Sequence, residues 1–181
     1  MSLLIAAVAS GWVSPRPCLY DAVVAHNRQV SSEILIRPLT ARDREVWSPL
    51  WDGYNEFYGR VGPTALDPAV TEQTWARLMD ATEPVWGLVA EINGRVVGFV
   101  HYLFHHATTL LAENCLLHDL FTTPEARGHG VGRALIEAVF EAAARAGSTR
   151  VYWTTHESNE TAQRLYDTLA ERGFIVYRHE L

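Results

Sequence analysis

The chain has 181 residues, 48% of them hydrophobic, and 15 basic against 21 acidic residues give a formal net charge of −6. This size suits one domain with its own core. The acidic balance excludes a general nucleic-acid binder, which needs a clustered positive surface, and favours a cationic partner. All the basic residues are arginine, which indicates the coding bias of a GC-rich, bacterial source.

The N-terminal part carries few structural signals. Residues 1–33 show no clear periodicity and contain Pro15 and Pro17, so we expect an extension outside the main domain, loosely packed. Its apolar run at residues 3–9 is too short to span a bilayer and lacks the basic start of a secretory signal. Cys18 and Cys115 form no disulfide or zinc pattern. We therefore expect a cytoplasmic protein without membrane contact.

From Ile34 the pattern becomes regular. Residues 34–37 predict a strand, and Thr40 is a suitable N-cap for a helix that runs to about Tyr58. A second helix is predicted around Thr71 to Met79.

Three strands follow. The apolar, β-branched runs Val85–Ile92 and Val96–Phe104 are separated by Asn93-Gly94, a pair that favours a two-residue hairpin turn. Residues 114–122 predict a third strand, which Pro124 ends. These strands form the antiparallel half of the predicted sheet.

The C-terminal half alternates between helix and strand. A glycine-rich loop precedes a helix that ends at Gly147, and strand Arg150–Thr154, helix Glu160–Arg172 and strand Phe174–Tyr177 follow. Together with the strand before the loop, they predict a β-α-β-α-β unit. The fold class is therefore α/β, a mixed sheet with helices on both faces. The helix after the loop has an apolar face formed by Val131, Leu135, Val139 and Phe140.

The glycine loop at residues 127–132 is the strongest functional signal. It lies between a strand and a helix, where backbone N–H groups and the helix N-terminus converge on an anion. Its spacing is Arg-Gly-x-Gly-x-Gly, and no Walker lysine follows. Neither ATP nor a dinucleotide is favoured.

This loop also carries a family resemblance. The segment LFTTPEARGHGVG (residues 120–132) resembles the acetyl-CoA motif of the GNAT superfamily, and NETAQRLY (residues 159–166) resembles its N-x-x-A-x-x-x-Y helix. The resemblance covers residues 34–181. WTTHESN (residues 153–159) and LHDLF (residues 117–121) are similar to the Hpa2-like histone and polyamine acetyltransferase branch.

The resemblance implies an activity and partners. The chain would move an acetyl group from acetyl-CoA, without a metal, to a primary amine on a polyamine-like molecule or basic peptide. The amine would attack directly in a ternary complex. A homodimer is the usual arrangement among such relatives and the commonest symmetry. The alternatives are another acyl donor or acceptor, or an acyl-CoA sensor without catalysis.

The cofactor residues are likewise implied by the resemblance. Backbone groups of Leu120 and Thr122 would pair with the pantetheine arm, which Asn159 would also hold. The loop at 127–132 would bind the pyrophosphate. The full set is Leu120, Phe121, Thr122, Arg127, Gly128, His129, Gly130, Val131, Gly132, Asn159 and Ala162.

Acyl transfer to an amine needs a base for the ammonium and an acid for the departing thiolate. Tyr166 is the candidate acid, with a core tyrosine as the alternative. His118 is the candidate base, because an unperturbed imidazole titrates near pH 6.5. Polyamine-type relatives carry glutamate there, so a structural histidine remains open. Asp119 is the rival base, and strand alternation would place it on the opposite face from His118.

The first helix offers candidates for the acceptor wall. Trp47, Trp51, Tyr54 and Tyr58 form an aromatic stripe, for which core packing is the competing interpretation. Aromatic and acidic groups suit a cationic amine. The candidate acceptor-binding residues are Trp51, Asp52, Tyr54, Glu56 and Tyr58. The three histidines at positions 101, 105 and 106 have poor spacing for a metal.

Overall fold

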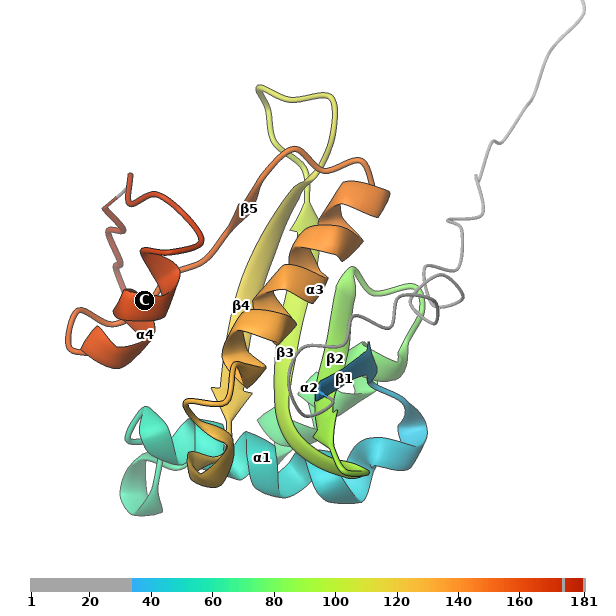
Figure 1. Cartoon of the computed structure of the whole chain (residues 1–181), viewed down its shortest axis with the longest axis vertical. Coiled ribbons are helices and arrows are strands. Elements are labelled where there is room, and N and C mark those ends of the chain that lie inside the picture. The colour runs from blue at the N-terminus through green and yellow to red at the C-terminus, as the bar shows by residue number, and fades with distance from the viewer. Residues whose placement is uncertain (1–33, 174, 181) are drawn as a thin grey trace, which may run out of the picture.

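The computed structural model describes residues 34–173 and 175–180, so the predicted extension at 1–33 lies outside the described residues. These form a five-stranded sheet in the order β1-β2-β3-β4-β5, with α3 on one face and α1 and α2 on the other (Figure 1). The strands are β1 (Ile34–Pro38), β2 (Val85–Ile92), β3 (Arg95–His105), β4 (Asn114–Thr122) and β5 (Val151–Tyr152). The helices are α1 (Arg44–Phe57), α2 (Pro68–Met79), α3 (Val131–Arg145) and α4 (Glu160–Tyr166), with 3-10 turns η2 (Ala41–Asp43), η3 (Gly62–Thr64) and η4 (Pro124–Ala126).

The antiparallel half forms as predicted. β1, β2, β3 and β4 pair antiparallel, and β5 pairs parallel to β4. Asn93 and Gly94 both have positive φ angles, 51° and 74°, as a two-residue hairpin turn with the twist of its strands requires. The predicted turn is therefore confirmed.

Each face of the sheet has its own core. On the α3 face, Leu135 and Val139 are fully buried against the sheet. On the opposite face, Trp47 and Phe99 are fully buried between α1 and the sheet. Such aromatic side chains each contribute about 1.5–3 kcal/mol by leaving water. The aromatic stripe of α1 therefore does pack in the core at its N-terminal end.

A β-bulge interrupts β4. Across the β3–β4 ladder, His101 pairs with Asp119 while the next β3 residue, Tyr102, pairs with Leu117, so His118 is an extra residue on β4. Such a bulge bends the strand and redirects its side chains. Leu117 packs in the α3-side core, but Asp119 is buried against the α1 face. The expectation that strict alternation separates His118 from Asp119 is therefore wrong, because the bulge breaks the two-residue period.

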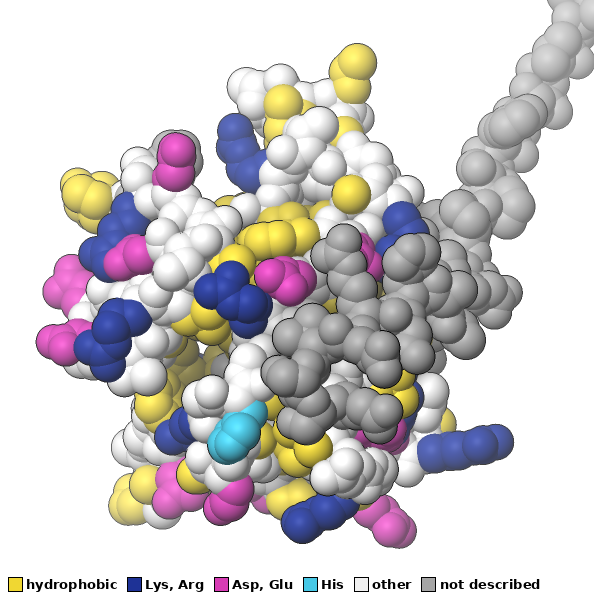
Figure 2. Space-filling view, in the orientation of Figure 1, with side chains coloured by type: hydrophobic (Ala, Val, Ile, Leu, Met, Phe, Trp, Pro, Cys, Tyr) yellow, Lys and Arg dark blue, Asp and Glu magenta, His cyan; other side chains and the backbone are white. Residues whose placement is uncertain are grey.

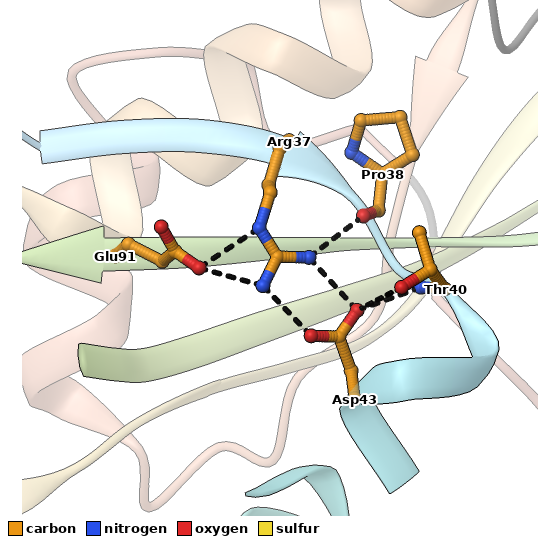
Figure 3. Close-up of polar contacts among 5 residues, drawn as sticks. All are labelled: Arg37, Pro38, Thr40, Asp43 and Glu91. Carbon is orange, nitrogen blue, oxygen red and sulfur yellow. Dashed lines mark hydrogen bonds and ion pairs between the residues drawn. The ribbon is translucent and has the colours of Figure 1, made fainter. Parts of the chain in front are cut away.

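A polar junction joins β1, β2 and the start of α1 (Figure 3). The Arg37 guanidinium donates to both carboxylate oxygens of Asp43, at 2.7 and 2.8 Å, and to Glu91 at 2.6 and 2.8 Å. Asp43 also accepts from the backbone N–H and hydroxyl of Thr40, both at 2.8 Å. The predicted N-cap Thr40 thus begins a 3-10 turn that leads into α1. The junction fixes the helix direction against the sheet edge.

The C-terminal region departs from three predictions. β5 is shorter than the predicted strand, and α4 ends at Tyr166 rather than Arg172. A tight turn ends α4, since Thr168 donates to the Leu165 carbonyl through both its backbone N–H and its hydroxyl. Residues 175–180 form no strand, and Phe174 lies outside the described residues. The side chains of residues 175–177 are at least 67% exposed, so no packing against the sheet stabilises that strand.

Candidate active site

A chain of hydrogen bonds runs from α1 over β3 to β4, on the α1 face of the sheet. The indole N–H of Trp47 donates to Nε2 of His101 at 3.0 Å. An indole can only donate, so Nε2 of His101 carries a lone pair and its proton is on Nδ1. Nδ1 lies 3.0 Å from a carboxylate oxygen of Asp119 and donates to it. His101 is therefore neutral, and Trp47 sets its tautomer.

His118 contacts the other oxygen of the same carboxylate. Its Nδ1 lies 3.1 Å from Oδ1 of Asp119 and donates the hydrogen bond. The lone pair of neutral His118 is therefore on Nε2, at the opposite side of the ring. Its side chain is 60% exposed, whereas that of Asp119 is 9% exposed. The hydrogen bond to Asp119 raises the pKa of His118 above its usual 6.5. The arrangement suits an accessible base held by a buried carboxylate.

Asp119 remains ionised in this position. Burial opposes ionisation of the Asp119 carboxylate, but hydrogen bonds from His101 and His118 outweigh it, so the pKa of Asp119 falls well below its usual range. Both oxygens are occupied by these histidines. Asp119 consequently orients His118 and is poorly placed to accept a proton itself.

Two tyrosines lie near Asp119. Tyr54 on α1 and Tyr58, the residue that follows the last turn of α1, lie edge to face with ring centroids 5.0 Å apart. Burial, and then the negative charge of Asp119, raises the pKa of both phenols. Tyr166 packs edge to face on Trp153 at 5.4 Å. Burial first, and then the neighbouring Tyr58, raises the pKa of Tyr166 to about 12. Tyr54 and Tyr58 thus form an aromatic wall, which lies near both Tyr166, the predicted acid, and Asp119, the partner of the predicted base.

The remaining residues predicted for the acceptor wall do not all lie together. Trp51 stacks on Tyr54 with centroids 5.4 Å apart, and so continues the wall. Asp52 and Glu56 are exposed on α1. Glu56 lines an open cavity of about 860 Å³ whose walls also include Phe57 and Arg127. Neither His118 nor Asp119 lines that cavity.

The glycine loop is shaped for an anion. Gly128 and Gly130 have φ angles of 78° and 86°, and Gly130 is the N-cap of α3. A Cβ atom built on Gly128 would meet no atom within 4 Å, so the backbone there is accessible. Within the described residues, no acceptor is hydrogen-bonded to the first N–H groups of α3 at Val131 and Gly132. The loop therefore fits the pyrophosphate of acetyl-CoA.

The other predicted cofactor residues have mixed placements. β4 pairs with β5 only at Cys115 and Leu116, so its edge from 117 to 122 faces no described strand and offers backbone groups to an extended ligand. The side chain of Phe121 packs in the α1-side core, which leaves only its backbone for a cofactor. Leu120 and Thr122 are half-buried, as is Ala162, while Arg127 and His129 are exposed.

The side chain of Asn159 caps the N-terminus of α4. Its side-chain oxygen accepts from the backbone N–H of Ala162 at 3.4 Å, and its amide donates to Thr155 at 3.2 Å. It thereby caps α4, the helix that carries Tyr166. Leu165 on the same helix lies against α3, where a Cβ on Gly132 would be 3.5 Å away. These contacts position Tyr166 beside the sheet.

The histidines 101, 105 and 106 have separate partners. His101 bonds to Trp47 and Asp119, His105 lies 2.9 Å from the Tyr152 hydroxyl, and His106 pairs with Glu113. Among the residues that the structure describes, no cluster of three or more metal-ligating side chains occurs.

Two neighbours of the His118–Asp119 pair have no functional signal in the sequence. The histidine spacing bears on His101 only as a metal ligand, and no motif includes Arg60. Both depend on register and loop geometry that no local pattern reports. The pairing of His101 with Asp119 follows from the β3–β4 register, and the bulge shifts that register by one residue.

Comparisons with a family model, with curated proteins and with solved structures all find acetyltransferases. The model of the acetyltransferase (GNAT) family matches residues 47–174. D-amino-acid N-acetyltransferase HPA3 of Saccharomyces cerevisiae is 37% identical over 145 residues, 79% of this chain and 88% of that protein. Thialysine N-epsilon-acetyltransferase of Mus musculus is 30% identical over 107 residues, 51% of this chain and 62% of that protein. The structure of AAC(6')-Iy with the bisubstrate analog CoA-S-monomethyl-acetylneamine has a TM-score of 0.65 at 21% identity, covering 83% of this chain and all of that one.

Proposed function

The chain belongs to the GNAT family of acetyltransferases, and we propose that it transfers the acetyl group of acetyl-CoA directly to a primary amine bound beside His118. The observation that carries this proposal is the His118–Asp119 pair on β4, the strand that precedes the glycine loop. Tyr58 lies close enough to Asp119 and to Tyr166 for its pKa to respond to the first and to affect the second. The acceptor classes that the sequence favours are polyamine-like molecules and basic peptides. The named relatives act on D-amino acids and thialysine, so amino acids join the candidates.

The residues supply each proton transfer. Nε2 of His118 takes a proton from the acceptor ammonium, directly or through one water, and leaves a neutral amine. A nitrogen–carbon bond then forms as the carbon–sulfur bond of the thioester breaks. Tyr166, whose phenol stays protonated at neutral pH, gives its proton to the departing thiolate. The nitrogen loses its second proton as the amide forms, and this proton restores the Tyr166 phenol, directly or through water. The buried Asp119 carboxylate stabilises the imidazolium that forms on His118.

The surface and the remaining expectations fit this proposal without deciding it. On the face shown in Figure 2, arginine and carboxylate side chains are interspersed, without a continuous basic surface for nucleic acid. No helix among the described residues is both long and apolar enough to cross a membrane. A homodimer, a cytoplasmic location and a bacterial source stay predictions of the sequence.

A screen for CoA thiol release tests the function. Acetyl-CoA is offered with polyamines, amino acids, aminoglycosides and basic peptides, and the acetylated product is identified by mass. We expect turnover with at least one acceptor class. If CoA binds but no acceptor in any class is acetylated, the chain is a sensor and the proposal is wrong. Turnover only with another acyl-CoA would correct the donor.

A further inference from the structure

Arg60 is held rigidly just beyond the end of α1. Its guanidinium donates to the side-chain oxygen of Asn55 at 3.0 Å, and its backbone N–H donates to the Asn55 carbonyl at 2.9 Å. Asn55 is 6% exposed and is itself fixed, because its amide donates to the Trp51 carbonyl at 2.8 Å. A buried asparagine thus orients an exposed arginine.

The guanidinium of Arg60 lies over the aromatic wall. Its central carbon is 5.5 Å from the ring centroid of Tyr58 and 6.0 Å from that of Tyr54. Stacking of this kind holds a planar cation while its N–H edge stays available. Tyr54 also stacks on Trp51, whose ring centroid lies 5.6 Å from that of His101, the residue that donates to Asp119. Arg60 thus borders the same aromatic cluster as the His118–Asp119 pair, and its positive charge lowers the pKa of His118, in opposition to the larger effect of Asp119.

Arg60 has no carboxylate partner among residues 34–173 and 175–180. Asp119 is the nearby anion, but both of its oxygens already accept hydrogen bonds from His101 and His118. Among the described residues, Asn55 provides the one oxygen that accepts a hydrogen bond from the Arg60 guanidinium. A fixed cation with spare donors is the group that binds a ligand carboxylate in a paired geometry.

From this arrangement we infer that Arg60 binds a carboxylate of the acceptor, and that the acceptor is an amino acid rather than a polyamine. The inference rests on the proposed function. The amine would lie at Nε2 of His118 while the carboxylate meets Arg60, so the opposite charges of a zwitterion match the site. A polyamine would instead bring further positive charge against Arg60, at a cost in affinity.

Matched acceptors separate charge recognition from general packing. Each amino acid of a D and L panel is compared with its own carboxamide, which keeps the amine and side chain but removes the negative charge. In Arg60→Gln, we expect kcat/KM for the amino acid to fall by about 10- to 100-fold, the usual range for a lost charged hydrogen bond. The carboxamide should change by less than about 3-fold, since it makes no such bond. Arg60→Lys should lie between, and Arg145→Gln, at an exposed position near the end of α3, is the control.

A binding measurement gives a readout that does not need turnover. Calorimetry with CoA-loaded protein compares an N-acetyl amino acid with its N-acetyl carboxamide, for the wild type and Arg60→Gln. The wild type should prefer the carboxylate and the variant should lose that preference. An equal loss for both ligands, or a preference unchanged by the variant, would refute the role of Arg60. If preference is lost but no acceptor is ever acetylated, Arg60 stands and the proposed function fails.

Discussion

The indole N–H of Trp47 donates to Nε2 of His101 and so fixes its tautomer, with the proton on Nδ1. Asp119 accepts from that Nδ1 and also from Nδ1 of His118, which leaves the lone pair of His118 on Nε2. Each step follows from which atoms can only donate and which can only accept. The result is a carboxylate held ionised in a buried position and an imidazole whose free nitrogen is accessible. Of the two residues that the sequence offers as the base, His118 is therefore the proposed base, and Asp119 is the residue that positions it.

Activity should therefore depend on pH through His118. Because Asp119 raises its pKa, kcat/KM should rise with pH along a limb centred above 6.5 as His118 loses its proton. His118→Ala should remove that limb and lower the rate by about 100- to 10,000-fold. Asp119→Asn should move the limb to lower pH, because the anion no longer stabilises the imidazolium. The other groups that act on this pair are His101, which donates to Asp119, Tyr54 and Tyr58, which lie near the charge of Asp119, and Arg60, which lowers the pKa of His118. An unshifted limb in a folded, CoA-binding Asp119→Asn protein would contradict the assignment.

Tyr166 is tested by removing only its hydroxyl. Tyr166→Phe keeps the ring against Trp153, so CoA affinity and stability should stay near those of the wild type. Loss of the proton donor should lower kcat by about 10- to 1000-fold where chemistry limits the rate. Stopped-flow measurement of a single turnover isolates that step. Wild-type kcat in the variant would leave Tyr166 a packing residue.

At the scale of an element, the loop before α3 depends on left-handed backbone. Gly130 has a φ of 86° at the N-cap of α3, and Gly147 has a φ of 78° just beyond its end. Both positions disfavour any residue with a Cβ. Only the first lies where the pyrophosphate would bind, so the two ends of α3 provide a matched comparison.

Gly130→Ala should weaken CoA binding, whereas Gly147→Ala should cost similar stability without affecting CoA. The strain at each site is about 1 kcal/mol. Wild-type protein should be stabilised by millimolar CoA through mass action, which raises its melting temperature. That increase should shrink in Gly130→Ala and persist in Gly147→Ala. Equal CoA-induced increases in both variants would show that the loop at 127–132 does not bind the cofactor.

For the molecule as a whole, the Arg37 junction ties β1 and the neighbouring start of α1 to β2, where Glu91 lies 54 residues further along the chain. Its arginine is 29% exposed and Asp43 is 7% exposed at the side chain, so the ion pair is partly shielded from water. Burial of Asp43 opposes ionisation, but hydrogen bonds from Arg37 and Thr40 prevail and lower the pKa of Asp43 below 3.8. The linked stability is thus present above that pH and is lost as pH falls through the lowered pKa.

Arg37→Lys should reduce the free energy of unfolding by about 1–3 kcal/mol, since one ammonium cannot bond both carboxylates in parallel. Urea titrations at neutral pH and at low pH measure the change. The difference from the wild type should narrow in acid, where protonated Asp43 no longer gains from the cation. Arg145→Lys, in an exposed pair with Glu141, should change stability little. A difference that is constant with pH would contradict the electrostatic account.

Elements whose signals are local can be predicted from the sequence alone. The Asn93-Gly94 turn, the strand at 114–122 and the helix opened by the glycine loop follow from turn chemistry and hydrophobic periodicity, and each is present. The family resemblance rests on the same contiguous segments. The C-terminal helix and strand were predicted less well, because a seven-residue α4 and residues 175–180 depend on neighbours more than on their own propensity.

The way in which the site residues meet depends on packing between elements and could not be predicted from the sequence. The β4 bulge places Asp119 opposite His101 and beside His118, and a one-residue change in register would turn each side chain to the other face. The lone pair on Nε2 of His118 depends on that contact. The stacking of Arg60 likewise depends on a buried Asn55 and two tyrosine rings. Residue spacing along the chain cannot report these contacts, because they arise from packing between elements that are distant in sequence.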